Sequence, residues 1–247
     1  MASASADQIL QSLRSDAPHR HFRGREFLVR KRETPHAIWL IEDGWAARFK
    51  LLRDGRRHIS RFYAPGDLCD LAWLVTESAD QSIIALTPVR AARLDRHRLD
   101  SRMRIDPAVS LTVARDALAE MRAQAEWLVT LGCKSASEKI AYFLCELYLR
   151  LERRGQARDH NCDFPLSQQD VADFTGMTAV HACRTLRDLR EAGLIELRRR
   201  RLRIIDFVRL ARMASFDRDC LPSDAECLPD VGAMAGPRDF PATAMVV

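Results

Sequence analysis

The chain has 247 residues, of which 47% are hydrophobic, and a formal net charge of +5 at pH 7, which fits one large or two medium domains with real cores. No apolar run approaches the roughly 18 residues that cross a bilayer, and the start "MASASADQIL" lacks a signal design, so we expect a cytoplasmic protein with no membrane partner. The seven cysteines are odd in number and include no C-x-x-C pair, which argues against a disulfide scaffold, a zinc ribbon and a clustered iron–sulfur site.

Residues from about 20 to 100 are strand-like and rich in turns. The three segments are "HAIWLIEDGWAARFKLL", "RDGRRHISRFYAPGDLCDLAWL" and "QSIIALTPVRAARLD". The turn signals Asp43-Gly44, Asp54-Gly55 and Pro65-Gly66-Asp67 recur at intervals of about ten residues, as expected for short antiparallel strands. This part of the chain is predicted to form an all-β roll or barrel.

Residues 106–131 are predicted to form one long helix. Apolar side chains recur there at alternating steps of three and four, which is the seam of a coiled coil. The seam consists of Leu111, Ala114, Leu118, Met121, Ala125 and Leu128. We expect it to hold a homodimer together; the alternative is packing on the chain's own β domain. Gly132 interrupts the pattern, and a second helix starts in "SASEKIAYFLCELYLRLE".

Two short helices with a glycine between them follow in "LSQQDVADFTGMTAVHACRTLRDLREAGLI". Ser167 is a good N-cap with Asp170 at the capping-box position, and Thr178 caps the second helix. Gly176 can take the positive φ that ends the first helix, and the small Ala172 lets the helices cross closely. The apolar side of the second helix consists of Ala182, Leu186 and Leu189. The arrangement predicts a helix-turn-helix, with an ordinary helical hairpin as the alternative.

A strongly basic segment adjoins the second helix. Residues 184–203 contain eight arginines and three acids, a local net charge of +5 that equals that of the whole chain. The stretch "IELRRRRLRII" is typical of a β-hairpin with a basic tip, so a basic wing flanks the helix and can follow a phosphate backbone. Only four of the 39 basic residues are lysine, so arginine is the preferred basic residue throughout the chain. That preference does not explain four consecutive arginines at a predicted hairpin tip.

The order of these elements resembles the Crp/Fnr family of bacterial transcription regulators over residues 7–216. The most specific stretches are "YAPGDLCDL", "SASEKIAYFLCELYLRL" and "PLSQQDVADFTGMTAVHACRTLRDLREAGLI". The resemblance implies an α+β fold with a cyclic-nucleotide-binding-like β-roll sensor domain, a dimerisation helix and a C-terminal winged helix-turn-helix. It also implies a homodimer on a pseudo-palindromic operator in double-stranded DNA, RNA polymerase as a partner, and an effector that the sequence does not specify.

The resemblance divides the chain into four parts. The sensor domain takes residues 1–105, the dimerisation helix 106–132 and the DNA-binding domain 133–216. Residues 217–247 hold six acids, two arginines and four of the ten prolines, and are predicted to be a flexible acidic tail.

The sensor departs from the cyclic-nucleotide-binding members of the family. Those members place Gly-Glu after the Pro-Gly-Asp turn to hold the ribose, and an Arg-Ser/Thr-Ala about ten residues later to clamp the phosphate. Here Cys69-Asp70 and Gln81-Ser82-Ile83 stand at these positions. Without the arginine an anion loses its bidentate partner, so we expect no cyclic AMP binding.

The sensor also differs from the iron–sulfur members of the family. The N-terminal cysteine cluster of the iron–sulfur members is missing, since Cys69 is the first cysteine, so we expect no such cluster. Haem stays open, although a lone histidine is usually a surface or core residue. The candidate ligands in the sensor are His19, His21, His36, His58 and Cys69.

The second helix of the helix-turn-helix is the candidate reading helix. Many family members carry a glutamate and an arginine four residues apart, which read base edges. Arg184 matches the arginine, Val180 stands where the glutamate would be, and His181 could contact a base or a phosphate. Helix N-termini and arginines favour phosphate. The candidate phosphate contacts are Ser167, Gln168, Gln169, Thr178, Arg187, Arg198, Arg199, Arg200 and Arg201.

Cys183 directly precedes Arg184 and is a candidate redox-sensitive residue, because its oxidation would place bulk and charge beside phosphate. The alternative is an unreactive thiol that fills a small site.

Two other function classes compete with a DNA-binding regulator. The chain could be a small-molecule-binding module whose basic end contacts RNA or an acidic protein, and salt-dependent, sequence-selective binding to duplex DNA would separate the two. It could be an enzyme, but it has no nucleophile elbow, P-loop or metal motif, so we expect that it is not.

Overall fold

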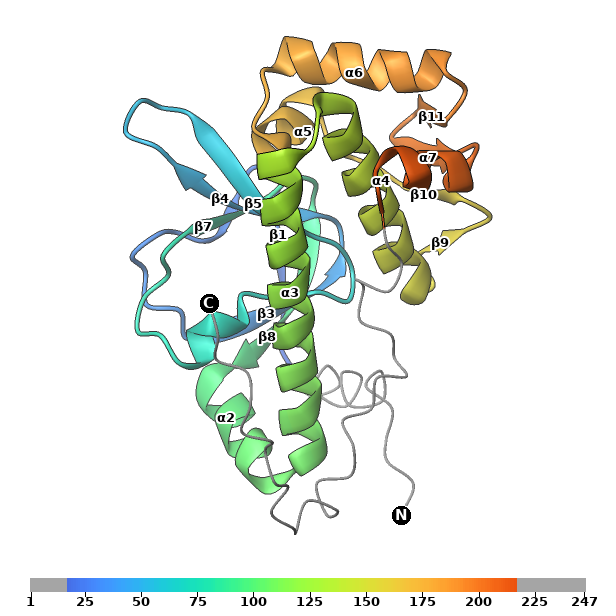
Figure 1. Cartoon of the computed structure of the whole chain (residues 1–247). Helices are drawn as coiled ribbons and strands as arrows, with labels where there is room; N and C mark the ends of the chain where they lie inside the picture. The colour runs from blue at the N-terminus through green and yellow to red at the C-terminus, as the bar shows by residue number, and fades with distance from the viewer. Residues whose placement is uncertain (1–16, 217–247) are drawn as a thin grey trace, which may run out of the picture.

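The computed structural model describes residues 17–216. A β-roll forms one side of the molecule and a mainly helical domain the other, and the long helix α3 runs between them (Figure 1). None of the helices within these described residues is long and apolar enough to cross a membrane. The predicted acidic tail, 217–247, lies outside the described residues.

The roll consists of two four-stranded antiparallel sheets, with strand orders β1-β8-β3-β6 and β2-β7-β4-β5, which confirms the predicted β-roll. The structure of the Asp43-Gly44 turn explains why glycine is required there. Gly44 has φ +83°, and a Cβ on it would lie 2.0 Å from the carbonyl oxygen of Pro88, so only glycine fits. The strands are β1 (His19–Phe22), β2 (Phe27–Val29), β3 (Ala37–Asp43), β4 (Ala46–Leu51), β5 (Arg57–Tyr63), β6 (Leu68–Cys69), β7 (Ser82–Ala85) and β8 (Val89–Asp95).

Two helical segments interrupt the region that the sequence presents as strand-like. Leu71–Leu74 forms a 3-10 helix, and Arg96–Ile105 forms α2. The side chain of Asp95 caps α2 by accepting from the amides of His97 and Arg98. This capping aspartate was the available signal for α2, but the apolar periodicity of the segment is too weak to reveal the helix.

Helix α3 (Pro107–Cys133) confirms the predicted long helix, which ends one residue after Gly132. The break falls at Lys134, whose backbone is extended. Ser135 and Glu138 then form a capping box that fixes the start of α4 (Ala136–Arg153).

The two faces of α3 have different surroundings. Val109, Thr112 and Val113 are buried against the roll, so the chain's own β domain covers one face. The predicted seam lies on another face, where Leu118 is 50% and Met121 66% exposed. Of the six seam positions only Leu111 is half-buried; the other five are exposed. The described part of this chain therefore leaves the seam uncovered.

The C-terminal domain packs a third antiparallel sheet, of order β11-β12-β10-β9, against its helices. The predicted hairpin is confirmed as β11 and β12, whereas β9, β10 and α7 had no clear signal in the sequence. The elements after α4 are β9 (Ala157–Arg158), β10 (Asn161–Asp163), α5 (Gln168–Thr175), α6 (Ala179–Glu191), β11 (Ile195–Arg198), β12 (Arg201–Ile204) and α7 (Phe207–Met213).

An aromatic cluster joins the roll, α3 and the C-terminal domain. The ring of Phe62 on β5 lies 5.0 Å from that of Phe174 on α5 and 5.6 Å from that of Phe143 on α4. Trp127 of α3 stacks on Phe174 at 4.3 Å. One continuous apolar core therefore runs from the roll into the C-terminal domain, and it fixes how the two sit relative to each other.

Candidate nucleic-acid interface

The first helix of the predicted helix-turn-helix begins and ends as its sequence indicates. The Ser167 hydroxyl accepts from the amide of Asp170 at 3.1 Å, and the Asp170 carboxylate accepts from the amide of Ser167 at 3.0 Å. Gly176 ends α5 in the left-handed region with φ +68°. The capping box and the glycine turn are thus confirmed.

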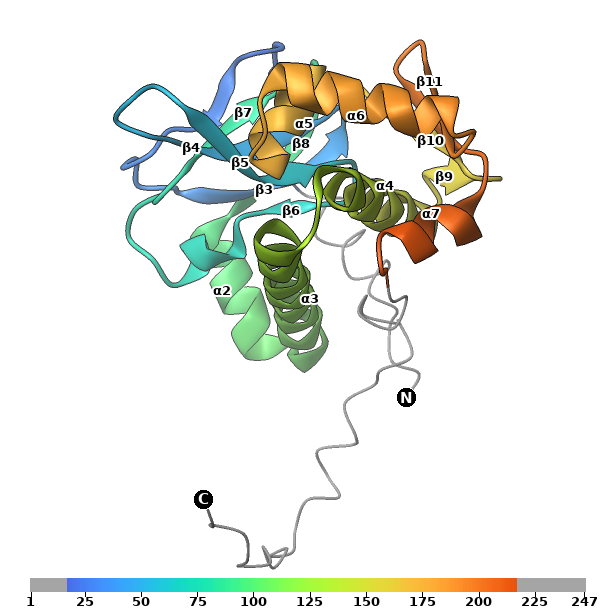
Figure 2. The ribbon, with the colours of Figure 1, turned by 45° about the horizontal axis from the view of Figure 1, so that its top comes forward.

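Helix α6 follows at once and packs across α5. Its N-cap is Thr178, whose hydroxyl accepts from the amide of His181 at 3.2 Å. In Figures 1 and 2, α6 lies along the outer edge of the molecule with α5 beneath it. Ala172 of α5 is fully buried at the crossing, as predicted for a small side chain there. The buried face of α6 consists of Ala182, Thr185, Leu186 and Leu189.

The outer face of α6 carries the predicted base-reading side chains. Arg184 and His181 are exposed, and Val180 is 71% exposed although it is apolar. Val180 and Arg184 are four residues apart and share one face. Within the described residues no ion pair or hydrogen bond engages the guanidinium groups of Arg184 and Arg187, so both are available to a ligand.

The wing ends in a strained turn made of arginines. Arg198 pairs with Arg201 across the hairpin, and Arg199 and Arg200 occupy the turn with φ of 49° and 61°. An L-residue in this region costs roughly 1–2 kcal/mol, and Asn-Gly is the preferred pair in such a turn. Glu196 contacts Arg198 at 2.9 Å and Asp163 contacts Arg201 at 3.3 Å. The chain therefore presents two exposed arginines in the turn of the wing despite the strain, which points to a role for their charge.

A long-range ion pair near the N-terminus of α5 could not be predicted from the sequence. Arg57 of β5 donates to Asp170 at 2.8 Å and to Asp173 at 2.5 Å, and so compensates both acids of α5. Gln168 and Gln169 stay exposed beside them. Arg57 lies 113 residues from Asp170, so no local pattern could have paired them.

The predicted phosphate contacts lie at the N-termini of α5 and α6, further along α6 at Arg187, and at the wing. All nine of them are exposed. Cys183 is half-buried between the inner and outer faces of α6. Five of the nine candidates are exposed arginines, and the roles of all nine in DNA contact are predictions.

The position of the cyclic-nucleotide motif in the roll is filled by protein side chains. Gln81 accepts a hydrogen bond from the Ser60 hydroxyl at 2.8 Å, and Ser60 in turn accepts from Nε of Arg48 at 3.2 Å. Asp70 is buried, with its carboxylate 3.4 Å from Arg48. The two residues that replace the ribose and phosphate contacts thus interact with other parts of this chain.

Comparison with known proteins matches both parts of this architecture. Residues 19–106 match the cyclic nucleotide-binding domain family, and residues 138–213 match the Crp-like helix-turn-helix domain family. The nitrogen fixation regulation protein FixK of Azorhizobium caulinodans is 32% identical over 160 residues, which cover 65% of this chain and 64% of the relative. The transcriptional activatory protein AadR of Rhodopseudomonas palustris is 31% identical over 202 residues, or 81% of this chain and 82% of the relative.

A solved structure agrees in fold as well as in sequence. FixK2 from Bradyrhizobium japonicum superposes with a TM-score of 0.72 and 26% identity, covering 80% of this chain and 96% of that one. The β-roll, the long helix and the winged helix-turn-helix therefore occur here in the order found in these relatives. The chain belongs to the Crp/Fnr family of bacterial transcription regulators and is a DNA-binding regulator of that type.

Proposed function

We propose that the chain binds a pseudo-palindromic operator as a homodimer, with α6 of each protomer in the major groove and the wing on the adjacent phosphates. The observation that carries this proposal is the outer surface of α6 and the wing, where Arg184, Arg187, Arg199 and Arg200 make no ion pair with other described residues. Relatives are named as transcriptional activators, so we include RNA polymerase among the partners.

The dimer part of the proposal rests on α3. Its seam is apolar, lies on a long straight helix and is exposed in the protomer, whereas the neighbouring face of the same helix is already buried on the roll. Two copies of α3 packed along this seam would place the two α6 helices on the same side of the dimer. A two-fold axis in the protein then requires a two-fold axis in the operator.

Genome-wide footprinting with and without the protein tests the proposal, together with binding to one recovered site at several salt concentrations. We expect protected sites with two-fold symmetry, and an affinity that falls steeply with salt, because arginine–phosphate contacts release counterions. Equal binding to all duplexes, or preferential binding to RNA, would instead favour the small-molecule module with a basic end.

Cyclic AMP is expected not to bind. Gln81 replaces the arginine that would clamp the phosphate, and its side-chain oxygen is already bonded to Ser60. The Asp70 carboxylate faces Arg48 rather than an open ribose site. Calorimetry of the purified protein with cyclic AMP and cyclic GMP should show no heat of binding at micromolar concentrations, and micromolar binding of either nucleotide would contradict this prediction.

We further propose that the roll works without an iron–sulfur cluster. Cys69 is fully buried in the roll core, where burial raises the pKa of its thiol well above the usual range and disfavours a ligating thiolate. Among the candidate haem ligands, His19, His21 and His36 lie at the surface and His58 is half-buried, and His19 contacts Glu42 at 3.1 Å. An absorption spectrum of protein purified without oxygen, with iron analysis, tests this.

Peroxide is expected to weaken operator binding through Cys183. This thiol is half-buried next to Arg184, so an oxidised sulfur would bring bulk and negative charge toward the phosphates. The affinity of the wild type should fall after peroxide treatment, while that of Cys183→Ser should not. Cys133→Ser is the matched control, because Cys133 is exposed at the end of α3, outside α6 and the wing, and should respond as the wild type does. Equal losses in the wild type and Cys183→Ser would show that Cys183 only fills space.

A further inference from the structure

A connected set of buried charges crosses from the roll to α3 at the level of the replaced cyclic-nucleotide motif. Arg48 of β4 is 8% exposed and donates to Glu120 of α3 at 2.9 Å. The same guanidinium holds Ser60, and through it Gln81, and lies 3.4 Å from Asp70. Glu120 is the nearer of the two carboxylates to Arg48, and burial raises the pKa of Asp70 despite the same guanidinium. One arginine therefore ties the motif position of the roll to the long helix.

The contacts continue from α3 toward the DNA-binding domain. Arg61 lies 3.8 Å from Glu120 and also 3.8 Å from Asp67, the aspartate of the Pro-Gly-Asp turn. Asp67 accepts from Arg150 at 2.9 Å and from Arg154 at 2.7 Å, both on α4. Burial alone would raise the pKa of Asp67, but Arg154, Arg150 and Arg61 lower it to about 2, so it stays ionised. The roll is thereby linked to α4, the first helix of the DNA-binding domain.

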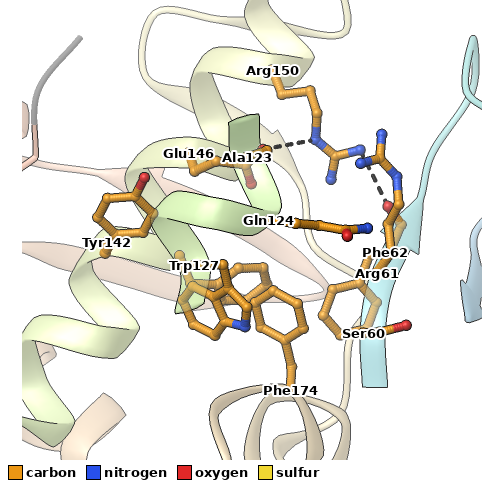
Figure 3. Close-up of a pocket in the computed structure, with 11 residues that line it drawn as sticks. Ser60, Arg61, Phe62, Ala123, Gln124, Trp127, Tyr142, Glu146, Arg150 and Phe174 are labelled. Atoms are coloured by element: carbon orange, nitrogen blue, oxygen red, sulfur yellow. Dashed lines mark hydrogen bonds and ion pairs between the residues drawn. The ribbon is translucent and has the colours of Figure 1, made fainter. Parts of the chain in front are cut away.

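The cavity beside Arg61 and Arg150 is too small for a nucleotide. It lies at the junction of β5, α3 and α5 and measures about 50 Å³, and Figure 3 shows Trp127, Phe174 and Gln124 on its walls, with Arg61 and Arg150 at one end. Pockets that hold small-molecule ligands measure roughly 300–1,000 Å³. A nucleotide-sized effector bound at this junction would have to displace the aromatic cluster or break the ion pairs.

Charges buried in this way strongly favour one arrangement of the parts that carry them. Taking one partner away leaves the other charged and desolvated, which costs far more than loss of a surface pair. The three parts that share these charges are the roll, α3 and α4. Their relative placement sets where α6 lies with respect to the seam of α3, and hence how two reading helices are spaced in a dimer.

We infer that these side chains take the place of a bound effector, so that the protein holds its DNA-reading arrangement without a small molecule. Arg48 supplies within the chain the cation that the motif position lacks, and Glu120 supplies the anion that a ligand would bring. Both are positioning residues for the reading helices. This inference rests on the proposed DNA-binding function and concerns its regulation.

The experiment compares the extensively dialysed wild type with Glu120→Gln, which keeps the size and removes the charge, and with Arg48→Gln. The control is Asp100→Asn, which removes an exposed ion pair with Arg104 of 3.0 Å on α2. We expect the dialysed wild type to bind its operator at full affinity and a pool of cellular small molecules to leave that affinity unchanged. Operator binding by either variant should be roughly 5- to 150-fold weaker, a typical size for coupling between sites. The control should bind as the wild type does.

Two further measurements separate positioning from a loss of folding. Sedimentation should show that both variants remain dimers, and hydrogen exchange should speed up at residues 57–63 and 168–175, where β5 meets α5, with each core still protected. Arg48→Lys keeps the charge and should recover part of the affinity.

Two results would overturn the inference. One is operator binding of both variants at the wild-type level; the other is a wild type that binds only after the small-molecule pool is added, in which case DNA binding itself stands. The dialysed wild type decides this second point even if a variant does not fold. A wild type that binds no duplex selectively under either condition would instead refute the proposed function.

Discussion

Replacement of both Leu118 and Met121 by glutamate is expected to give a folded monomer that has lost its operator affinity. The two side chains are 50% and 66% exposed in the protomer, so their removal leaves no hole in a core. In a dimer packed along the seam, the change buries four carboxylates against each other, and their repulsion and desolvation oppose association. Because specific DNA binding exceeds non-specific binding by 10³-fold or more, loss of the second half-site should cost operator affinity by roughly that factor.

The matched control is the double replacement of Ile205 and Val208 by glutamate. These two residues are 52% and 68% exposed, nearly the same as the seam pair, but Ile205 lies just before α7 and Val208 in its first turn. Sedimentation should show that the control remains a dimer and that the seam variant is a monomer with an unchanged circular dichroism spectrum. A seam variant that sediments as a dimer would move the interface away from this face of α3.

Replacement of Arg184 by alanine is expected to relax the choice of base at one position in each half-site. Arg184 lies on the outer face of α6, opposite the buried Leu186, and it has no ionic partner among the described residues. Its guanidinium can bridge O6 and N7 of one guanine in the major groove. Removal should cost about 1–3 kcal/mol per half-site. Binding-site selection with the wild type and the variant measures the change, and we expect half-site centres about 34 Å apart.

A variant of the wing is expected to change the affinity for DNA without changing the preferred sequence. Arg199→Asn with Arg200→Gly puts the preferred residues into a turn whose φ values are already positive, so the hairpin should become more stable. Binding should weaken alike for all sequences, and the slope of log affinity against log salt should flatten by about 0.9 per lost phosphate contact. A shift of preferred sequence in the wing variant, or none in Arg184→Ala, would reverse the assigned roles. His181 is then the next candidate for base reading.

The features that the sequence predicts well are those built from neighbouring residues. The capping box of Ser167, the turn at Gly176 and the cap at Thr178 all depend on contacts within three or four residues. The wing follows from a basic tip between two short strands, and the apolar seam follows from steps of three and four that recur along α3. Such features depend on contacts between neighbouring residues, so they form wherever the helix or strand itself forms.

Caps mark two helix boundaries more clearly than composition does. Helix α3 ends just after Gly132, and the capping box at Ser135 decides where the next helix begins. Half of the residues of α2 are charged, so its apolar periodicity could not reveal it, and only the cap at Asp95 marks it. In each case a cap that satisfies free backbone amides was a better guide than composition.

The sequence by itself determined the order of the parts, the residues of the proposed DNA surface and the apolar seam of α3, because each is encoded by residues close together in the chain. Only the tertiary structure decided how the parts are held to one another. Arg48 reaches Glu120 across 72 positions, Arg57 reaches Asp170 across 113, and Arg150 reaches Asp67 across 83. Such pairs produce no periodic pattern in the sequence, because the packing of whole helices and strands, and not the spacing along the chain, determines which residue lies next to a buried charge.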